Sequence, residues 1–103
     1  MHSIEWAAGL FEGEGCMTTD KQGLHSIKLS MTDEDVVHKF ASMFGLNVNG
    51  PYTYNNRPTN KSYWVCKSKS QTKVREIISS MLPYFGNRRA YKALNILDDL
   101  ELA

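Results

Sequence analysis

Two glutamates alternate with glycines at the end of a short apolar stretch near the start of the chain, residues 6–15 (WAAGLFEGEG). Gly9 and Gly13 lie four positions apart, so in a helix they share one face that carries no side chain. Glycine inside a helix costs about 0.5–1 kcal/mol relative to alanine, so two of them indicate that another backbone approaches this face. Glu12 and Glu14 follow where the helix ends. The Glu14 carboxylate and the glycine carbonyls there could hold a divalent cation; an ordinary amphipathic helix with an acidic, glycine-rich end is the alternative.

The apolar pattern of the whole chain predicts the elements that position this stretch. Apolar residues recur with helical spacing in some segments and with strand alternation in others. The expected helices cover residues 1–13, 32–44, 71–81 and 88–102, and the expected strands cover residues 15–20, 24–31, 52–54 and 61–69. Two similar helix–strand–strand units followed by further helix imply an α+β fold of order αββαββα(α). We expect a four-stranded antiparallel, saddle-shaped sheet with its helices on one face.

Alternation along the expected strands divides side chains between the core and the open sheet face. Ile27 and Leu29 point one way, whereas Ser26, Lys28 and Ser30 point the other. The open face is therefore polar, and it either meets solvent alone or binds a polar partner. The expected core positions are Ile27, Leu29, Met31, Val36, Val37, Phe40, Met43, Phe44, Trp64, Cys66, Val74, Ile77, Ile78, Met81, Ala90, Leu94, Leu97 and Leu100.

Capping residues mark the expected helix ends. Ser3 is expected to cap the first helix, and Thr32 the second, with Asp35 in a capping-box position. Gly45 is expected to end that second helix. The acids at 33–35 suit the first turn of a helix, which explains them without the alternative of a metal site there.

Composition bounds the possible partners. The chain has 103 residues and a formal net charge of +1, so we expect one domain over residues 1–103 and no strongly basic character. Its charges are segregated, with basic residues at 57–75 and 88–92 and acidic residues at 33–35 and 98–101. Segregated charge is compatible with a nucleic-acid-binding face.

The two cysteines, Cys16 and Cys66, lack the spacing of a metal site. We interpret them as free thiols in a reducing compartment, with a disulfide as the alternative. No apolar run approaches the ~20 residues of a membrane span, and no signal peptide opens the sequence. We therefore expect a cytoplasmic protein without a membrane partner. The start at Met1 favours a free-standing chain over a fragment of a longer protein that contains two such repeats.

Residues Ala7 to Gly15 resemble the nine positions of the LAGLIDADG motif, with Trp6 before it and an extended segment from Cys16 after it. The segment Leu-Pro-Tyr-Phe at 82–85 is similar to the family's Leu-Pro-Tyr-Leu segment before its final helix. The predicted order of elements agrees with the LAGLIDADG fold over essentially the whole chain. The resemblance implies a homing endonuclease, which cuts double-stranded DNA at specific sites, with an intron-associated role.

The resemblance also implies how the site is assembled. In that family two motif helices, from two chains or two repeats, pack across a pseudo-twofold axis, and the last acidic residue of each motif binds the catalytic metal. One motif per chain implies a homodimer. The implied cofactor is Mg2+, held by Glu14, by the backbone carbonyl of Gly13 and by the scissile phosphates. The implied dimer interface comprises Ala8, Gly9, Glu12 and Gly13, with Glu12 capping the partner helix or orienting the site.

Two positions depart from the family pattern. Gly86 stands where many members have a lysine after the Leu-Pro-Tyr-Leu segment, and Met31 stands where a glutamine is frequent. Lys28, Lys69 and Arg88 are possible substitutes, so the candidate catalytic residues are Glu14, Lys28 and Arg88. Lysines at these positions are also explained as plain phosphate contacts. The alternative functions are a cleavage-deficient DNA-binding regulator, an RNA-binding intron maturase, and a domain that binds no nucleic acid.

Alternation and the resemblance together nominate a set of DNA-binding residues on the open sheet face and its loops. Lysine and arginine read guanine edges, and serine and threonine accept several bases. The three tyrosines are equally explained as cross-strand packing pairs, and Lys69 as a phosphate contact. The set is Cys16, Thr18, Asp20, Ser26, Lys28, Ser30, Tyr52, Tyr54, Arg57, Tyr63, Lys67 and Lys69.

Overall fold

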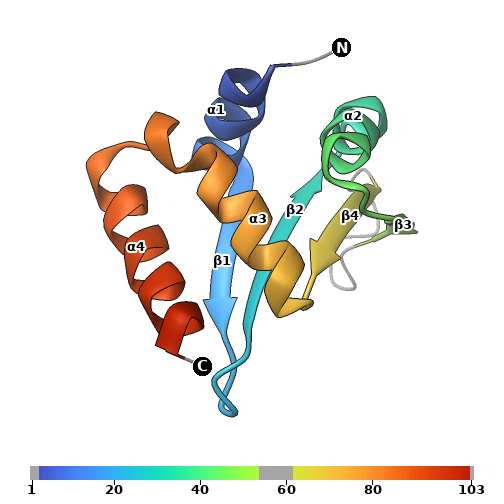
Figure 1. Cartoon of the computed structure of the whole chain (residues 1–103). Helices are drawn as coiled ribbons and strands as arrows, with labels where there is room; N and C mark the ends of the chain where they lie inside the picture. Colours follow the sequence, from blue (N-terminus) through green and yellow to red (C-terminus); the bar gives the residue numbers. More distant parts are fainter. Residues whose placement is uncertain (1–2, 54–61, 103) are drawn as a thin grey trace.

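A computed structural model describes residues 3–53 and 62–102 (Figure 1). The elements in chain order are α1 (Ile4–Glu14), β1 (Gly15–Thr19), β2 (His25–Met31), α2 (Glu34–Phe44), β3 (Val48–Tyr52), β4 (Tyr63–Ser68), α3 (Gln71–Met81), the short 3-10 helix η1 (Leu82–Tyr84) and α4 (Asn87–Leu102). The predicted α+β order is therefore confirmed.

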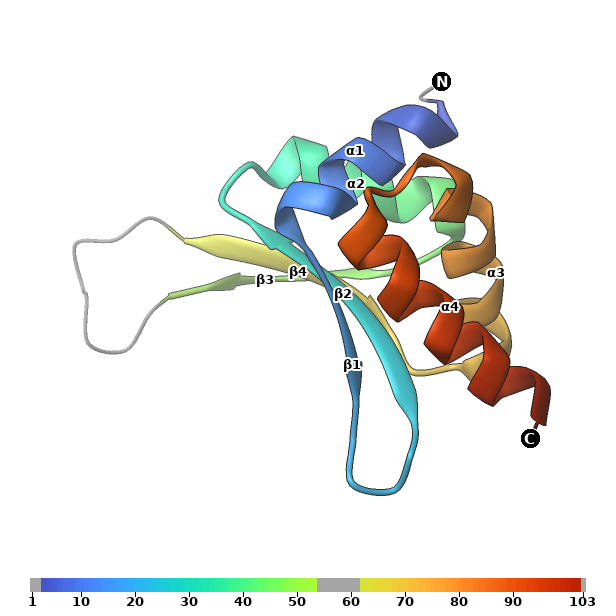
Figure 2. The same ribbon diagram turned by 90° about the vertical axis from the view of Figure 1, so that its left-hand side faces the viewer.

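The four strands form one antiparallel sheet in the order β1-β2-β4-β3. The helices cover one face of this sheet, and β3 and β4 extend away from α3 and α4 (Figure 2). The opposite face is open, as the sequence predicted. The two β2 residues that were expected to point inward, Ile27 and Leu29, are fully buried, whereas Lys28 between them is exposed.

The core lies between the helices and the sheet, and Phe11 of α1 is its centre. The Phe11 ring stacks on Phe40 of α2 at a centroid distance of 6.0 Å and on Phe85 at 6.1 Å. Met17 and Cys66 close the sheet side of the same cluster. Aromatic and aliphatic burial of this kind is the main stabilising contribution in a chain of this size.

The third strand differs from the prediction. β3 runs Val48–Tyr52, ahead of the predicted 52–54, of which Tyr54 lies outside the described residues. Val48 pairs with Cys66 and packs on the core. Pro51 lies within β3, which is an edge strand that pairs only with β4 in the described sheet, and an edge strand tolerates a residue without an N–H.

The start of α2 also differs. Asp33 and not Thr32 is the N-cap, and no side chain makes a capping hydrogen bond. The backbone N–H groups of Val36 and Val37 donate instead to the carbonyl of Asp33. The other end is confirmed, since Gly45 caps the helix with a left-handed φ of 67°.

In α4 the predicted core positions Leu97 and Leu100 pack against the core, but Leu94 does not. Leu94 is 47% exposed, whereas Ala93 and Ile96 are buried. The reason lies in the first turn of the helix, where Arg89 is held against α1. Residues four and seven positions beyond Arg89 lie on the same helix face, so Ala93 and Ile96 are turned inward with it.

Candidate nucleic-acid and metal site

The candidate site lies where α1 ends and β1 begins. At its start, α1 is capped as predicted, with the Trp6 N–H donating to Ser3 Oγ at 3.1 Å. At its end, the helix continues through Glu14 directly into the extended backbone of Gly15, whose N–H donates to the Phe11 carbonyl. A Cβ at Gly15 would overlap the Phe11 ring. This glycine is therefore required because the central core side chain occupies the space of a side chain there.

The bare face of α1 is present on the surface. Gly9 and Gly13 are both exposed, and a Cβ at either position would meet nothing within 4 Å. Within the described structure, therefore, neither position has to be glycine to make room for its own chain. Ala8 was predicted to join them at a dimer interface, but its side chain is fully buried in the chain's own core. Ala8 therefore does not belong to the exposed face formed by Gly9 and Gly13.

Glu12 is held within its own chain. Its Oε1 accepts the Gly86 N–H at 2.6 Å, and its Oε2 accepts Arg89 Nε at 2.9 Å. The pKa of the Glu12 carboxyl lies below its ordinary value, because the Gly86 N–H donates to the carboxylate and because Arg89 adds a hydrogen bond and a positive charge; these effects outweigh burial. The Glu12 carboxylate oxygens therefore bind Gly86 and Arg89 of the same chain, which favours the predicted role of orienting the site over that of capping a partner helix.

Glu14 differs from Glu12 in that it faces solvent. It lines a surface hollow of about 260 Å³ with Ser30, Met31, Thr32, Asp33 and Tyr63, at the end of β2 and the start of β4. Asp33, which the sequence indicated only for capping, is thereby a second carboxylate at the rim of the hollow. Carboxylate, hydroxyl and carbonyl oxygens are the donors that Mg2+ and Ca2+ prefer.

One chain offers only part of a metal site. Among the described residues there is no group of three His, Cys, Asp or Glu side chains that could hold an ion. The oxygen donors around Glu14 therefore fit a divalent ion whose remaining ligands come from water, from a phosphate or from a second chain.

The other two candidate catalytic residues lie outside the Glu14 hollow. Arg88 lines a separate hollow of about 310 Å³ beside Arg89, Tyr91 and Lys92 in the first turns of α4. Lys28 lies on the open sheet face. Lys69 follows the end of β4 and is exposed. Met31, by contrast, lines the Glu14 hollow directly.

The open sheet face carries most of the nominated DNA-binding residues. Lys28 of β2 is directly paired with Lys67 of β4, and on its other side it is paired with Cys16 of β1. Two like charges opposite one another repel, so a negative partner is favoured between them. A hollow of about 310 Å³ contains both lysines with Asn49, Tyr52, Tyr63 and Val65.

The remaining nominated residues divide into three groups. Thr18 and Ser26 bond each other across the hairpin at 2.6 Å, and the Tyr52 and Tyr63 rings pack at 5.6 Å between centroids. Asp20 Oδ1 accepts the backbone N–H groups of Gln22 and Leu24 at 2.9 Å, so it shapes the turn. Tyr54 and Arg57 lie outside the described residues.

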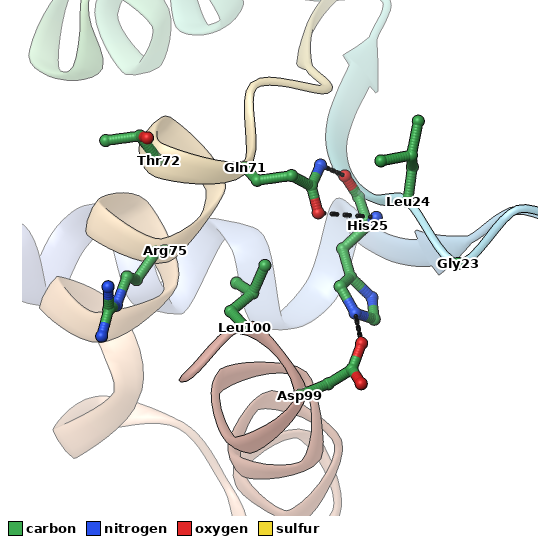
Figure 3. Close-up of a pocket in the computed structure, with 8 residues that line it drawn as sticks. All are labelled: Gly23, Leu24, His25, Gln71, Thr72, Arg75, Asp99 and Leu100. Carbon is green, nitrogen blue, oxygen red and sulfur yellow. Dashed lines mark hydrogen bonds and ion pairs between the residues drawn. The ribbon is translucent and has the colours of Figure 1, made fainter. Parts of the chain in front are cut away.

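Sequence reasoning missed His25, the first residue of β2, which pairs with Thr19 at the far end of β1 (Figure 3). The ring is buried, with Nδ1 2.7 Å from Thr19 Oγ1 and Nε2 2.6 Å from Asp99 Oδ2. The Gln71 side chain bonds both the N–H and the carbonyl of His25. The signal was present, because His25 has the same strand parity as Ile27 and Leu29.

Both cysteines are free thiols, as predicted, with Cys16 exposed and Cys66 buried. Burial raises the pKa of the Cys66 thiol from 9.0 to about 11. In residues 3–53 and 62–102, no helix combines the length and apolar character needed to cross a bilayer.

Comparison with solved structures identifies the fold. The chain superposes on the homing endonuclease I-CvuI with a TM-score of 0.72 at 16% identity, covering 95% of this chain and 65% of that one. It superposes on the homing endonuclease I-TnaI with a TM-score of 0.69 at 13% identity, covering 96% of this chain and 71% of that one. For the LAGLIDADG homing endonuclease I-GzeII the TM-score is 0.74 at 17% identity, covering 99% of this chain and 36% of that one.

The chain thus has the LAGLIDADG homing endonuclease fold, as its sequence motif indicated, although it spans only 65% of the I-CvuI chain. No protein-family model matches the sequence, and no curated protein is significantly similar to it.

Proposed function

We propose that this protein is a site-specific double-strand DNA endonuclease that acts as a homodimer and uses Mg2+. The observation that carries the proposal is the placement of Glu14. This exposed carboxylate ends a helix with a bare glycine face, beside a sheet whose open face is polar and carries paired lysines. The fold agreement with homing endonucleases supports the same conclusion.

The open sheet face would bind the duplex. The sheet contains two antiparallel strand pairs, β1–β2 and β3–β4, and a DNA major groove admits a two-stranded ribbon. Lys28 and Lys67 would bind a guanine edge or a phosphate between them, and Ser30 and Cys16 would contact neighbouring groups. The I-CvuI and I-GzeII structures both contain DNA targets, which favours duplex DNA as the partner.

The bare face of α1 would provide the dimer contact. Gly9 and Gly13 leave an exposed helix face without side chains, and a second copy of α1 packed on this face would bring two Glu14 carboxylates together. One carboxylate for each DNA strand would then be available. This arrangement also supplies the ligands that one chain lacks.

Glu14 and the carbonyl of Gly13 would hold the Mg2+ ion. The ion, when bound, polarises the scissile phosphate and supplies an activated water. The chain's own residues would bind and orient the substrate: Lys28 and Lys67 fix the duplex, and Glu12 and Arg89 hold the end of α1 in place. One I-CvuI structure was obtained with Ca and another with Mg, which supports a divalent ion at such a site.

The test is cleavage of a randomised duplex library by the purified chain, with Mg2+ or with EDTA. We expect cuts at one sequence, only with Mg2+, and a particle mass by light scattering of twice 11.7 kDa. Absence of cleavage together with a monomer at high concentration would contradict the proposal.

Lys28→Met tests the sheet face in the same assay. Loss of one phosphate or base contact should weaken DNA binding by about tenfold and reduce the salt dependence by about one ion. Lys39→Met is the matched control, because Lys39 is exposed on α2. If Lys28→Met and Lys39→Met bind DNA equally tightly, the sheet face is not the DNA-binding surface.

A second candidate is a protein that binds nucleic acid without cutting it, either a DNA-binding regulator or an RNA-binding intron maturase. Met31 favours it, because this residue lines the Glu14 hollow and cannot orient water. Binding of a duplex or of a structured intron RNA that is unchanged in Glu14→Gln, without cleavage by the wild type, would select this candidate.

A further inference from the structure

We infer that Arg89 is a positioning residue that fixes the Gly13–Glu14 end of α1, an inference that rests on the proposed metal-binding function of this end. The guanidinium makes three bonds to the segment around these two residues. Nε donates to Glu12 Oε2 at 2.9 Å, Nη2 to the Glu12 carbonyl at 3.0 Å, and Nη1 to the Gly15 carbonyl at 3.3 Å. The two carbonyls stand immediately before and immediately after Gly13–Glu14.

These hydrogen bonds provide partners for backbone carbonyls that have none within the last turn of α1. The last four carbonyls of a helix have no partner in the helix. The Phe11 carbonyl accepts the Gly15 N–H, and the Glu12 carbonyl accepts Arg89. The carbonyl of Gly13 lies outside these bonds, which leaves its oxygen available as a ligand beside the Glu14 carboxylate. A positive charge at this position is also favoured by the helix dipole.

Arg89 is itself held between the Phe11 ring and Glu12. Its side chain is 15% exposed and its guanidinium carbon lies 5.4 Å from the centre of the Phe11 ring. The Glu12 carboxylate that it binds is held from the other side by the Gly86 N–H. A Cβ at Gly86 would come within 3.3 Å of Glu12 Oε1, so a small residue there keeps this contact close.

Lysine could not reproduce this arrangement. Its ammonium is a point donor, whereas the planar guanidinium reaches three oxygens at fixed angles. We therefore expect Arg89 to restrict the direction in which Glu14 projects, in the way that partners behind a metal ligand orient it. Arg88, the residue nominated from the sequence, makes no such contact with the end of α1 in the described structure.

The test compares Arg89→Met and Arg89→Lys with Lys92→Met, an exposed position on the same helix with the same loss of charge. Amide exchange of residues 13–16 should rise by about tenfold or more in Arg89→Met, the effect of losing charged hydrogen bonds. Exchange at Ile77 and Ile78 in the core should follow only the change in global stability. The exchange rate of residues 13–16 in Arg89→Lys should lie between those of the wild type and Arg89→Met, and the rate in Lys92→Met should match the wild type.

Metal binding is read separately, from Mn2+-induced broadening of the Glu14 amide signal. The half-saturating Mn2+ concentration should rise by about tenfold in Arg89→Met. Wild-type exchange and broadening in Arg89→Met would overturn the inference; if that variant does not fold, the same comparison is decided on Arg89→Lys. Absence of Mn2+ broadening in the wild type would count against the proposed function, and the exchange data would then decide the role of Arg89 alone.

Discussion

The two ends of β1 are both tied to α4, but by different chemistry. At the start of the strand, Arg89 from the first turn of α4 binds the carbonyl of Gly15 and the end of α1. At the far end, Asp99 from the last turns of α4 binds His25, which in turn contacts Thr19. Beside the Arg89 contacts, the Glu14 carboxylate is exposed. At the other end, both ring nitrogens of His25 are used in contacts with Thr19 and Asp99.

This difference shows how one helix can serve both stability and function. Both ring nitrogens of the buried His25 are already bonded to Thr19 and Asp99, so we interpret the His25 end as structural. The Arg89 end holds the backbone while leaving Glu14 and the Gly13 carbonyl outward. If this comparison is correct, changes at the two ends should separate activity from stability.

Glu14→Gln should have the largest effect. Loss of the charged ligand should reduce single-turnover cleavage by about 10²–10³-fold, comparable to removal of one charge-stabilising group elsewhere. Because Glu14 is exposed, the free energy of unfolding should change by only about 0.5 kcal/mol. Glu5→Gln, an exposed glutamate in the first turn of α1, is the control and should cleave normally.

His25→Ala should have the opposite profile. It removes a buried ring and its contacts with Thr19 and Asp99, so urea unfolding should show a loss of about 2–3 kcal/mol. Asp99→Ala should cost less, because its side chain is 62% exposed. Mn2+ broadening at Glu14 should be unchanged in both variants below their unfolding transitions. A weakened metal response in His25→Ala would break the distinction between the two ends.

Alkaline pH tests the core behind both ends. The raised pKa of Cys66 means that the folded state favours the neutral thiol, so this stabilisation is complete below pH 9 and is lost as pH rises through about 11. The loss should be on the order of 2 kcal/mol. Stability curves of Cys66→Ala should lack this part of the alkaline decline, whereas Cys16→Ser, at the exposed thiol, should retain it.

Gly9→Ala should give the smallest effect and sharpen the role of the bare helix face. A Cβ has room within the chain, so helix propensity should stabilise the monomer by about 0.5–1 kcal/mol. If a second α1 packs there, the same methyl group should weaken the dimer, which sedimentation at several concentrations would detect. A dimer that remains equally tight would show that α1 is not the contact.

Much of the fold was predictable because its signals are local. Helical periodicity located α3, periodicity together with the Ser3 cap located α1, and alternation located β2. The position of β3 was not predictable in this way, because Gly50 and Pro51 are typical of a loop and only pairing with β4 makes them a strand.

The candidate site was predictable in part. The motif singled out Glu14 and the two glycines of the bare face, because their spacing in a helix is set by the helix itself. Arg88 was nominated and Arg89 was not, because nothing local distinguishes two adjacent arginines. Ala8 and Glu12 were predicted at a dimer interface, whereas in the structure Ala8 is buried in the core and Glu12 binds Arg89 of its own chain.

The sequence by itself determined the order of the elements, the glycine face of α1 and the carboxylate at its end, because each depends on neighbours within a few residues. Only the tertiary structure decided that Arg89 and Gly86 hold Glu12, that Asp99 holds His25, and that Asp33 shares a hollow with Glu14. Residues 12 and 89, or 25 and 99, are far apart in the chain. Their contact depends on how α4 packs against α1 and the β1–β2 hairpin, which no local pattern encodes.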